Sequence, residues 1–227
     1  HELENMYVLE KPKAVFVSSK SNVTGYKLPY SQICEISKKY NCVITLDASQ
    51  SFMIDKNINE ADADFIVFAG HKSLYATFGI AGFIKKTSYS LKPTKFGGTG
   101  SDTMNNDMPE ELPTKYEAGS PNIVAIIGLN TSLKWIKDKQ IEEKEKELTQ
   151  YFLKCVKDIP KVKVYIPENE EKCIGIVSIS IDEYLSEDVG QILDEEYDIF
   201  IPINKRVGNV ILLINKAIIE FSSGEYK

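Results

Sequence analysis

The stretch between Asp47 and Lys72 decides the fold that this sequence predicts. It reads Leu46-Asp47-Ala48-Ser49-Gln50 and then, after a polar interval, Asp64-Phe65-Ile66-Val67-Phe68-Ala69-Gly70-His71-Lys72. Two short apolar runs, Cys42–Leu46 and Phe65–Ala69, predict buried strands. The acid and the amine each follow the end of one strand, about one crossover unit apart. In an open α/β sheet, side chains just past the carboxyl ends of the strands face one ligand crevice, so we expect Asp47 and Lys72 to meet there.

The flanking sequence supports a sheet of this kind. Short apolar runs alternate with helical patterns, and such alternation argues for a parallel sheet with crossover helices. Further strands are expected at Ala14–Ser18 and Gly79–Ile84, and a helix with proline in its first turn at Pro29–Tyr40. Residues 92–122 are rich in glycine and proline and predict one long loop, which in a compact domain is usually functional or disordered.

The second half of the chain predicts one long helix and a second group of strands. A helical pattern runs from Asn122 to about Val156, and the charges at Lys137–Lys146 are expected on its solvated face. Another helix is expected at Ser186–Tyr197, with Ser186 as its N-cap. Strands are expected at Lys161–Tyr165, Ile174–Ile181, Ile199–Ile201 and Val210–Ile214. We place a boundary inside the long helix, so that residues 1–137 form a large domain and residues 138–227 a small one.

The bulk composition narrows the functional classes. The 227 residues are 43% hydrophobic and 26% charged, which suits one large domain or two small ones. A net charge of -6 indicates no nucleic-acid partner. No apolar run is long enough to span a membrane and no secretory signal pattern appears, so we expect no membrane partner. The four cysteines lack paired spacing, which favours reduced thiols in a cytoplasmic protein, and we assign no metal ligands.

An acid and an amine in one crevice suit pyridoxal 5'-phosphate. A lysine must hold the aldehyde of this cofactor as a Schiff base, and a carboxylate must keep its pyridine nitrogen protonated. Gln50 could donate to the phenolic oxygen of the ring, and His71 could reach the phosphate. On spacing alone a plainer interpretation stays open, because an Asp after a strand is often a helix cap and a His-Lys pair often lies on the surface.

Five segments, taken in order, resemble the motifs of one family. Leu46–Gln50 matches an Asp-Ala-x-Gln motif, and Asp64–Lys72 ends in the counterpart of Ser-Gly-His-Lys. Ser21–Gly25 matches a Ser-Asn-Val-x-Gly turn. Gly97–Ser101 matches Gly-Gly-x-Gly, and Tyr116–Asn122 matches Phe-Glu-x-Gly-Thr-Pro-Asn. By these motifs residues 15–136 resemble the class V aminotransferases, of the cysteine desulfurase type.

The resemblance implies a fold and a reaction. The fold is the pyridoxal-phosphate-dependent transferase fold type I, which is aspartate aminotransferase-like: an α/β large domain with a mostly parallel sheet and a small α+β C-terminal domain. The reaction removes sulfur from L-cysteine and leaves alanine. Lys72 and His71 are the implied catalytic residues. Lys72 holds the cofactor as a Schiff base and moves the α-proton of the substrate, and His71 contacts the phosphate.

The resemblance also implies further cofactor-binding residues. Asp47 pairs with the pyridinium, Gln50 bonds the ring oxygen, and Asn22 lies beside that oxygen or the substrate. Ser120 stands at the family's threonine and would reach the phosphate bound by the neighbouring subunit. The family's site is therefore a site of a homodimer.

The chain departs from the family pattern on the phosphate side. Ala69 stands where the family has a phosphate-binding serine, Ala76-Thr77 where it has Gly-Pro, and Ser19 where it has a histidine. The family's first ~150 residues, about one domain in length, supply the Gly-Thr phosphate cup and the aromatic group that stacks on the ring. The resemblance begins after them, so we expect the chain to be N-terminally incomplete.

The second departure concerns sulfur chemistry. Desulfurases use a cysteine thiolate within Arg-x-Gly-x-His-Cys on a small-domain loop, but the corresponding region, Tyr197–Arg206, has no cysteine. Cys155 lies in a helix pattern and Cys173 enters a strand, so we expect both to be structural thiols. Arg206, the single arginine, is a candidate for binding the substrate carboxylate. The chain as given is therefore expected to be inactive as a cysteine desulfurase.

Three functions remain open. The first is a desulfurase-like enzyme whose N-terminal part lies outside this sequence, which the glycine segment at Gly97–Ser101 followed by Asp102 favours. The second is another class V aminotransferase or an epimerase, which needs the lysine but no catalytic cysteine. The third is a degenerate homologue that serves in dimerisation or partner binding. The absent cysteine favours the second and the third.

Overall fold

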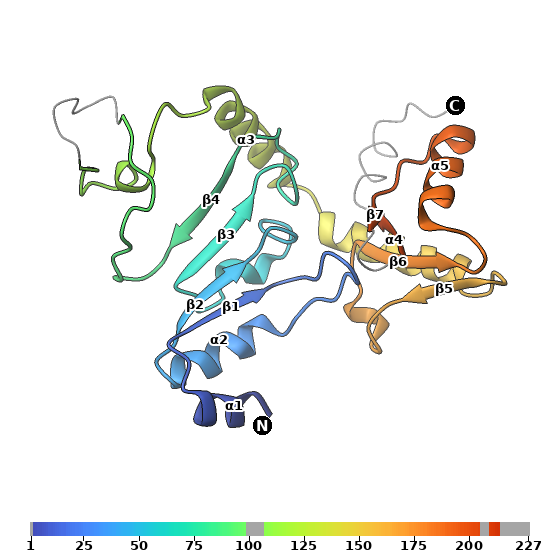
Figure 1. Ribbon diagram of the computed structural model, residues 1–227, viewed down its shortest axis with the longest axis horizontal. Coiled ribbons are helices and arrows are strands. Elements are labelled where there is room, and N and C mark those ends of the chain that lie inside the picture. Colours follow the sequence, from blue (N-terminus) through green and yellow to red (C-terminus); the bar gives the residue numbers. More distant parts are fainter. Residues whose placement is uncertain (1, 99–106, 205–208, 214–227) are drawn as a thin grey trace.

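The computed structural model describes residues 2–98, 107–204 and 209–213, and these residues form two four-stranded sheets (Figure 1). The first sheet has the order β1-β2-β3-β4 and the second β5-β6-β8-β7. The strands are β1 Ala14–Ser18, β2 Val43–Asp47, β3 Phe65–Ala69, β4 Ala81–Lys85, β5 Val162–Tyr165, β6 Ile176–Ile181, β7 Ile203–Asn204 and β8 Asn209–Leu213. The helices are α1 Glu2–Glu10, α2 Tyr30–Lys39, α3 Ile123–Ile136, α4 Ile141–Val156 and α5 Ser186–Tyr197, with short 3-10 turns η1 Lys56–Asn59, η2 Thr114–Tyr116 and η3 Glu170–Lys172.

The first sheet is the mostly parallel sheet that the sequence predicts. Strands β1, β2 and β3 are parallel, and β4 returns antiparallel to β3. The register aligns Ser18 with Asp47, and Asp47 with Val67. The three parallel strands therefore end at one edge, and α2 is the crossover between the first two.

The two faces of this sheet differ. Ile44, Leu46 and Ile66 point to one face, where they are buried in a core with Cys34 of α2. On the opposite face, which also carries Asp47, Phe16 is 79% exposed. Parallel sheets are normally covered on both faces. In the described part of the chain, this sheet thus has one packed face and one open face.

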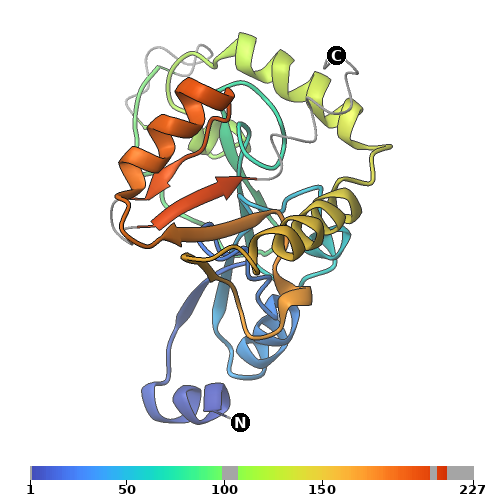
Figure 2. The ribbon, with the colours of Figure 1, turned by 90° about the vertical axis from the view of Figure 1, so that its right-hand side faces the viewer.

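The second sheet is wholly antiparallel. Leu153 of α4 packs with Cys173 and Val177, and Val189 of α5 packs with Ile201. Figure 2 shows α5 lying along the strands of this sheet. No helix in the described ranges is both long and apolar enough to cross a membrane.

The single helix predicted from Asn122 to Val156 is wrong, because α3 and α4 are separate helices. Ile136 ends α3 and Ile141 begins α4, and both side chains are buried in the first core. On one continuous helix they would lie about 140° apart around the axis. The break lets both face the same core. The domain boundary after residue 137 falls within the break and stays a prediction.

Other local predictions also need correction. Ile199–Ile201 is not a strand: Asp198 adopts a left-handed conformation, and Ile199 N–H donates to the Leu193 carbonyl to close α5. The short strand β7 begins only after Pro202. The N-cap of α5 is Leu185 rather than Ser186, and β4 begins at Ala81 rather than Gly79. Helix α1 was not predicted, and the predicted strand end at Ile214 lies outside the described residues.

Candidate functional site

Except for Ser120, the predicted site residues that the structure describes lie on three loops at the ends of the parallel strands. Asn22 follows β1, Asp47 ends β2 with Gln50 three residues later, and His71-Lys72 follows β3. Because the three strands are neighbours in parallel register, these loops emerge at the same edge of the sheet.

Serine side chains and backbone groups bind the three loops together. The backbone N–H and the hydroxyl of Ser19 both donate to the Asp47 carbonyl, at 2.9 and 3.1 Å. The Ser19 hydroxyl also shares a hydrogen bond with Ser51. On the other side, Ser73 N–H donates to the Ser49 carbonyl at 3.4 Å. The loop after β2 is therefore held from both neighbouring strands.

Asp47 presents its carboxylate on the open face. It lines a cavity of about 390 Å³ together with Phe16, Thr45 and Val67. Ser49 N–H donates to Oδ1 at 2.9 Å, and within the described ranges no other group bonds this carboxylate. The second oxygen, Oδ2, is therefore available to a ligand with an N–H group.

Lys72 projects from a tight turn in which the next two residues, Ser73 and Leu74, are buried. Its own backbone bonds back to Ala69 and forward to Tyr75, at 3.3 and 3.0 Å. Ser73, 2% exposed, donates its hydroxyl to the Phe52 carbonyl at 3.1 Å. Anchoring of the turn by its buried residues leaves the Lys72 amine exposed at the edge of the sheet.

Asn22 lies at the tip of a turn that is closed from within. The Ser21 hydroxyl accepts hydrogen bonds from Val23 N–H and Thr24 N–H, at 3.2 and 3.1 Å. Gly25 N–H donates to the Ser21 carbonyl, and its φ of 64° is one that a side chain would strain. The Asn22 side chain remains exposed at this tip.

The other candidates differ in their surroundings. Gln50 is half-buried on the turn after Asp47. The His71 ring stacks on Phe78 with centroids 4.6 Å apart, and both are exposed. Ser120 is exposed just before α3, where the preceding Gly119 N–H donates to the Gly98 carbonyl at 2.8 Å.

The start of the glycine motif at Gly97–Gly98 and the motif Tyr116–Asn122 are therefore neighbours. The family resemblance assigns both motifs to one site shared between subunits. Thr99, Gly100, Ser101 and Asp102 of the predicted glycine segment lie outside the described residues. No contact of Ser120 with the three loops is described.

Of the two thiols predicted to be structural, Cys173 is buried and Cys155 is exposed. Cys173 is 1% exposed, and burial, followed by the negative charge of Glu170, raises its pKa to about 11. A thiol with this pKa is almost wholly protonated near neutrality and is a poor nucleophile. Cys155 is exposed on α4. Arg206, the predicted carboxylate-binding residue, lies outside the described residues.

The candidate residues match the ring and aldehyde of pyridoxal phosphate better than they match its phosphate. An exposed amine and a carboxylate with a free oxygen emerge from adjacent strands, as the aldehyde and the ring nitrogen require. Beside them, Ala69 offers no hydroxyl to a phosphate, and His71 is engaged with Phe78. The ring end is therefore the better matched part of this site.

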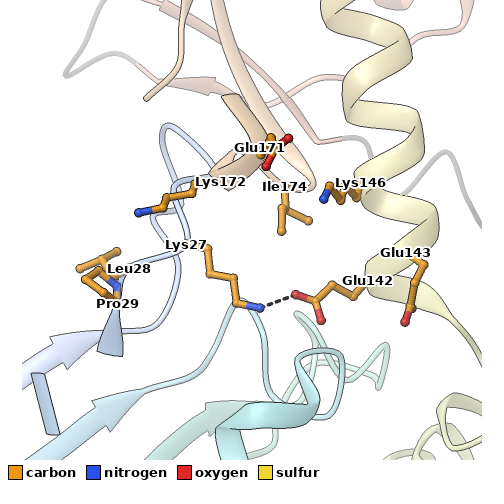
Figure 3. A pocket seen from close by; sticks show the side chains of 9 residues that line it. All are labelled: Lys27, Leu28, Pro29, Glu142, Glu143, Lys146, Glu171, Lys172 and Ile174. Atoms are coloured by element: carbon orange, nitrogen blue, oxygen red, sulfur yellow. Dashed lines mark hydrogen bonds and ion pairs between the residues drawn. The ribbon is translucent and has the colours of Figure 1, made fainter. Parts of the chain in front are cut away.

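A second cavity, of about 460 Å³, lies between the two sheets and contains none of the predicted site residues. Its lining is mostly charged and includes Lys27, Glu142, Lys146 and Lys172. Figure 3 shows the Lys27 amine directed to the Glu142 carboxylate, at 2.6 Å. Lys27 also pairs with the buried Asp55 at 3.0 Å.

Sequence reasoning missed the residues that join the loops. Ser49 enters the sequence analysis only as part of a motif and Ser19 only as a departure from the family, and Ser51 and Ser73 do not enter it at all. A signal was present, because a serine lies within four residues of the end of each parallel strand. Small polar residues at such positions can satisfy loop backbone groups.

Comparison with known proteins identifies relatives. The family model for class V aminotransferases matches residues 2–212. A Halalkalibacterium halodurans protein named "Probable cysteine desulfurase" is 32% identical over 197 residues, covering 83% of this chain and 48% of that protein. A cysteine desulfurase of Shigella sonnei is 28% identical over 204 residues, covering 85% and 49%. The chain spans about half the length of the curated relatives it matches.

Solved structures agree on the fold. A cysteine desulfurase from Thermococcus onnurineus NA1 gives a TM-score of 0.77 at 22% identity, over 98% of this chain and 62% of that one. A cysteine desulfurase from Escherichia coli gives 0.78 at 20% identity, over 91% and 56%. The predicted type I fold is confirmed. With a family model that matches nearly its whole length, the chain belongs to the class V aminotransferases.

Proposed function

We propose that this chain is the cofactor-binding and C-terminal portion of a pyridoxal-phosphate-dependent enzyme of the cysteine desulfurase type. Its substrate is L-cysteine or a similar amino acid. The supporting observation is that Asp47 and Lys72 lie at the ends of two adjacent parallel strands. The loops that follow these strands are joined by the hydrogen bond from Ser73 N–H to the Ser49 carbonyl. An amine and a carboxylate held at one sheet edge are the two groups that this cofactor requires.

Each candidate residue has one task in this proposal. Bound pyridoxal phosphate would supply an electron sink for the α-carbon of the amino acid. The Lys72 amine would hold the aldehyde of the cofactor, and its Nζ would take and return the α-proton of the amino acid. Asp47 Oδ2 accepts from the ring N–H and so stabilises the ring's positive charge.

Further residues orient the cofactor. Gln50 would donate to the ring oxygen, Asn22 would contact that oxygen or the substrate, and His71 would contact the phosphate. Ser120 serves the phosphate of the neighbouring subunit, so the proposal includes a homodimer. We also propose a cytoplasmic location, in keeping with the unpaired thiols.

A second candidate is an aminotransferase or epimerase of the same family. The lack of a suitable thiol favours this candidate. The region Tyr197–Arg206 has no cysteine, and Cys173 is buried with a raised pKa. A desulfurase needs an exposed thiolate near the substrate sulfur. These alternatives share the Lys72 chemistry and differ in what happens to the β-carbon.

The first experiment tests the cofactor. Pyridoxal phosphate is added to the purified chain, visible absorbance is recorded, and the mixture is reduced with borohydride and digested for mass spectrometry. We expect an absorption band and a label on Lys72. Lys72→Ala should abolish both, whereas Lys134→Ala, which removes an exposed lysine of α3, should leave them unchanged. Equal labelling of Lys72→Ala and the wild-type chain would disprove the assignment.

The reaction is tested separately with cysteine and a reductant, by measuring sulfide and alanine. We expect no steady release from the chain as given, because it has no suitably placed thiol. Turnover that disappears in Lys72→Ala would contradict this expectation and establish desulfurase activity. Amino transfer to a 2-oxo acid, without sulfide release, would support the second candidate.

A further inference from the structure

One ion pair is buried on both sides. Lys20 Nζ lies 3.2 Å from Glu145 Oε2, and the two side chains are 5% and 0% exposed. In each of the other ion pairs described, at least one of the two side chains is 26% or more exposed. Removal of two charges from water is unfavourable, and apolar residues of the same volume are often at least as stable. Stability alone therefore does not explain why Lys20 and Glu145 are buried together.

The surroundings of Glu145 are shaped around its carboxylate. Glu145 occupies the buried stripe of α4, in line with Ile141 and Thr149. Gly175 faces it with a φ of 76°, and a Cβ there would lie 2.5 Å from Oε2. Thr149 hydroxyl donates to the Glu145 carbonyl at 2.6 Å and accepts from Gly175 N–H at 2.8 Å. The backbone around Glu145 is therefore fixed, and its carboxylate is bonded through Oε2 to Lys20.

Lys20 is part of the stem that carries the Asn22 turn. Residues Lys20 and Lys27 face each other as an antiparallel bridge, and the turn lies between them. Both stem lysines are tethered to α4, Lys20 to Glu145 and Lys27 to Glu142, about one helical turn apart. Helix α4 is thus bonded to the base of the turn through two ion pairs.

The second sheet holds the far end of the same turn. Ser178 hydroxyl donates to the Val23 carbonyl at 2.5 Å, and Ile174 N–H donates to the Gly25 carbonyl at 3.1 Å. At Gly25 a Cβ would lie 2.3 Å from the Ile176 carbonyl oxygen. The position of Asn22 is therefore set by α4 and β6 as well as by β1.

Both Glu145 and the loop that carries Lys72 have a buried polar atom without a partner among the described residues. Glu145 Oε1 is buried without a hydrogen-bond partner, and so is the hydroxyl of Tyr75, three residues beyond Lys72. Burial, and after it the charge of Glu145, raises the pKa of Tyr75. The carboxylate therefore lies within electrostatic range of the Lys72 turn.

We propose that Glu145 is a positioning residue for the candidate site: through Lys20 it holds the Ser21–Gly25 turn, and with it Asn22, in register with the loops of Asp47 and Lys72. This inference rests on the proposed pyridoxal phosphate site. Its basis is that a buried ion pair fixes one geometry, whereas apolar packing is non-directional.

The first test measures the turn itself, by amide hydrogen exchange in wild type, Glu145→Gln and Glu143→Gln. Glu143→Gln is the matched control, because it lies on the same helix and its partner is the exposed Lys56 rather than a lysine of the turn. In Glu145→Gln we expect about tenfold faster exchange in residues 21–25, the effect of one lost charge-assisted bond, with β1–β3 unchanged. Equal acceleration in the turn and the strands, or none in the turn, would overturn the inference.

The second test separates position from stability. Lys20→Met/Glu145→Leu removes both charges at similar volume, so we expect its thermal midpoint to return towards that of wild type. Its affinity for pyridoxal phosphate, measured from the visible absorption, should remain about tenfold weaker, as in Glu145→Gln. Recovery of both midpoint and affinity would show a purely structural pair and overturn the inference.

The two proposals fail in different ways. Wild-type chain without any cofactor absorption would overturn the proposed function, and with it the role of Glu145 at that site. Normal cofactor absorption in wild type, together with an unchanged affinity and absorption maximum in Glu145→Gln, would overturn the positioning role alone.

Discussion

Asp47 and Lys72 are the residues on which the chemistry depends, and they are supported differently. Lys72 projects from a turn anchored by buried neighbours, whereas Asp47 is exposed on the open face with a single bond to its carboxylate. An exposed carboxylate with a free oxygen contributes little to folding. Its loss should therefore affect ligand binding far more than stability.

We predict that Asp47→Ala binds pyridoxal phosphate ten- to a hundredfold more weakly, because one charge-assisted hydrogen bond contributes about 1.5–3 kcal/mol. The measurement is titration with cofactor followed by visible absorbance. Thermal unfolding should remain close to that of wild type. Asp158→Ala, which removes an exposed carboxylate beyond α4, is the control and should bind normally. Unchanged affinity in Asp47→Ala would rule out the assigned pairing.

At the scale of elements, Asp64 joins α2, β2 and β3. Its Oδ2 accepts from Ile44 N–H at 2.8 Å, and its Oδ1 pairs with Lys38 of α2 at 2.7 Å. Asp64 N–H donates to the Ile44 carbonyl at 3.0 Å, just before β3. Burial raises the pKa of this carboxyl, but the bonds from Lys38 and Ile44 outweigh it and hold the pKa below its ordinary value of 3.8.

A lowered folded pKa gives this interaction a definite pH dependence. Its stabilisation is present above the unfolded pKa and is lost as pH falls through the folded pKa. We predict that Asp64→Asn lowers the free energy of unfolding by about 1–3 kcal/mol at pH 7, since it weakens bonds to buried groups. The difference from wild type should shrink in urea titrations as the pH is lowered below the ordinary pKa of 3.8.

The matched control is Asp62→Asn, because Asp62 is 70% exposed and lies 3.9 Å from the same lysine. Exposed ion pairs contribute little, so this variant should unfold like wild type. A difference between Asp64→Asn and wild type that stays constant with pH would contradict the assigned ionisation.

On the scale of the whole molecule, apolar surface remains open in two places. Phe16 is exposed on the free face of the first sheet, and α3 exposes Ile123, Val124 and Ile127. Contiguous exposed apolar surface commonly marks an interface. Together with the shared-site role that the family implies for Ser120, this supports association of two chains.

We predict that light scattering gives twice the chain mass of 25.6 kDa. Val124→Lys, on the outer side of α3, should shift the equilibrium towards the monomer, because a charge would enter an apolar contact. Thr131→Lys, on an exposed position of the same helix, is the control. A wild-type monomer at all practical concentrations would refute the dimer.

The sequence by itself determined the parallel strands and the edge at which the site lies. β1 and β3 were predicted with correct bounds, and β2 to within one residue, because short apolar runs and the turns after them are local properties. Asp47, Gln50, His71 and Lys72 were singled out by their places at the ends of those strands, whereas Asn22 and Ser120 were assigned only by the family resemblance. Their roles towards a cofactor remain predictions.

Only the tertiary structure decided what depends on contacts between distant segments. The break between α3 and α4 exists because Ile136 and Ile141 share one core, which no helical pattern reveals. Lys20 and Glu145 each resemble ordinary surface residues in the sequence. They become a buried pair because α4 and the stem of the Asn22 turn, 125 residues apart, pack together and exclude water from both charges.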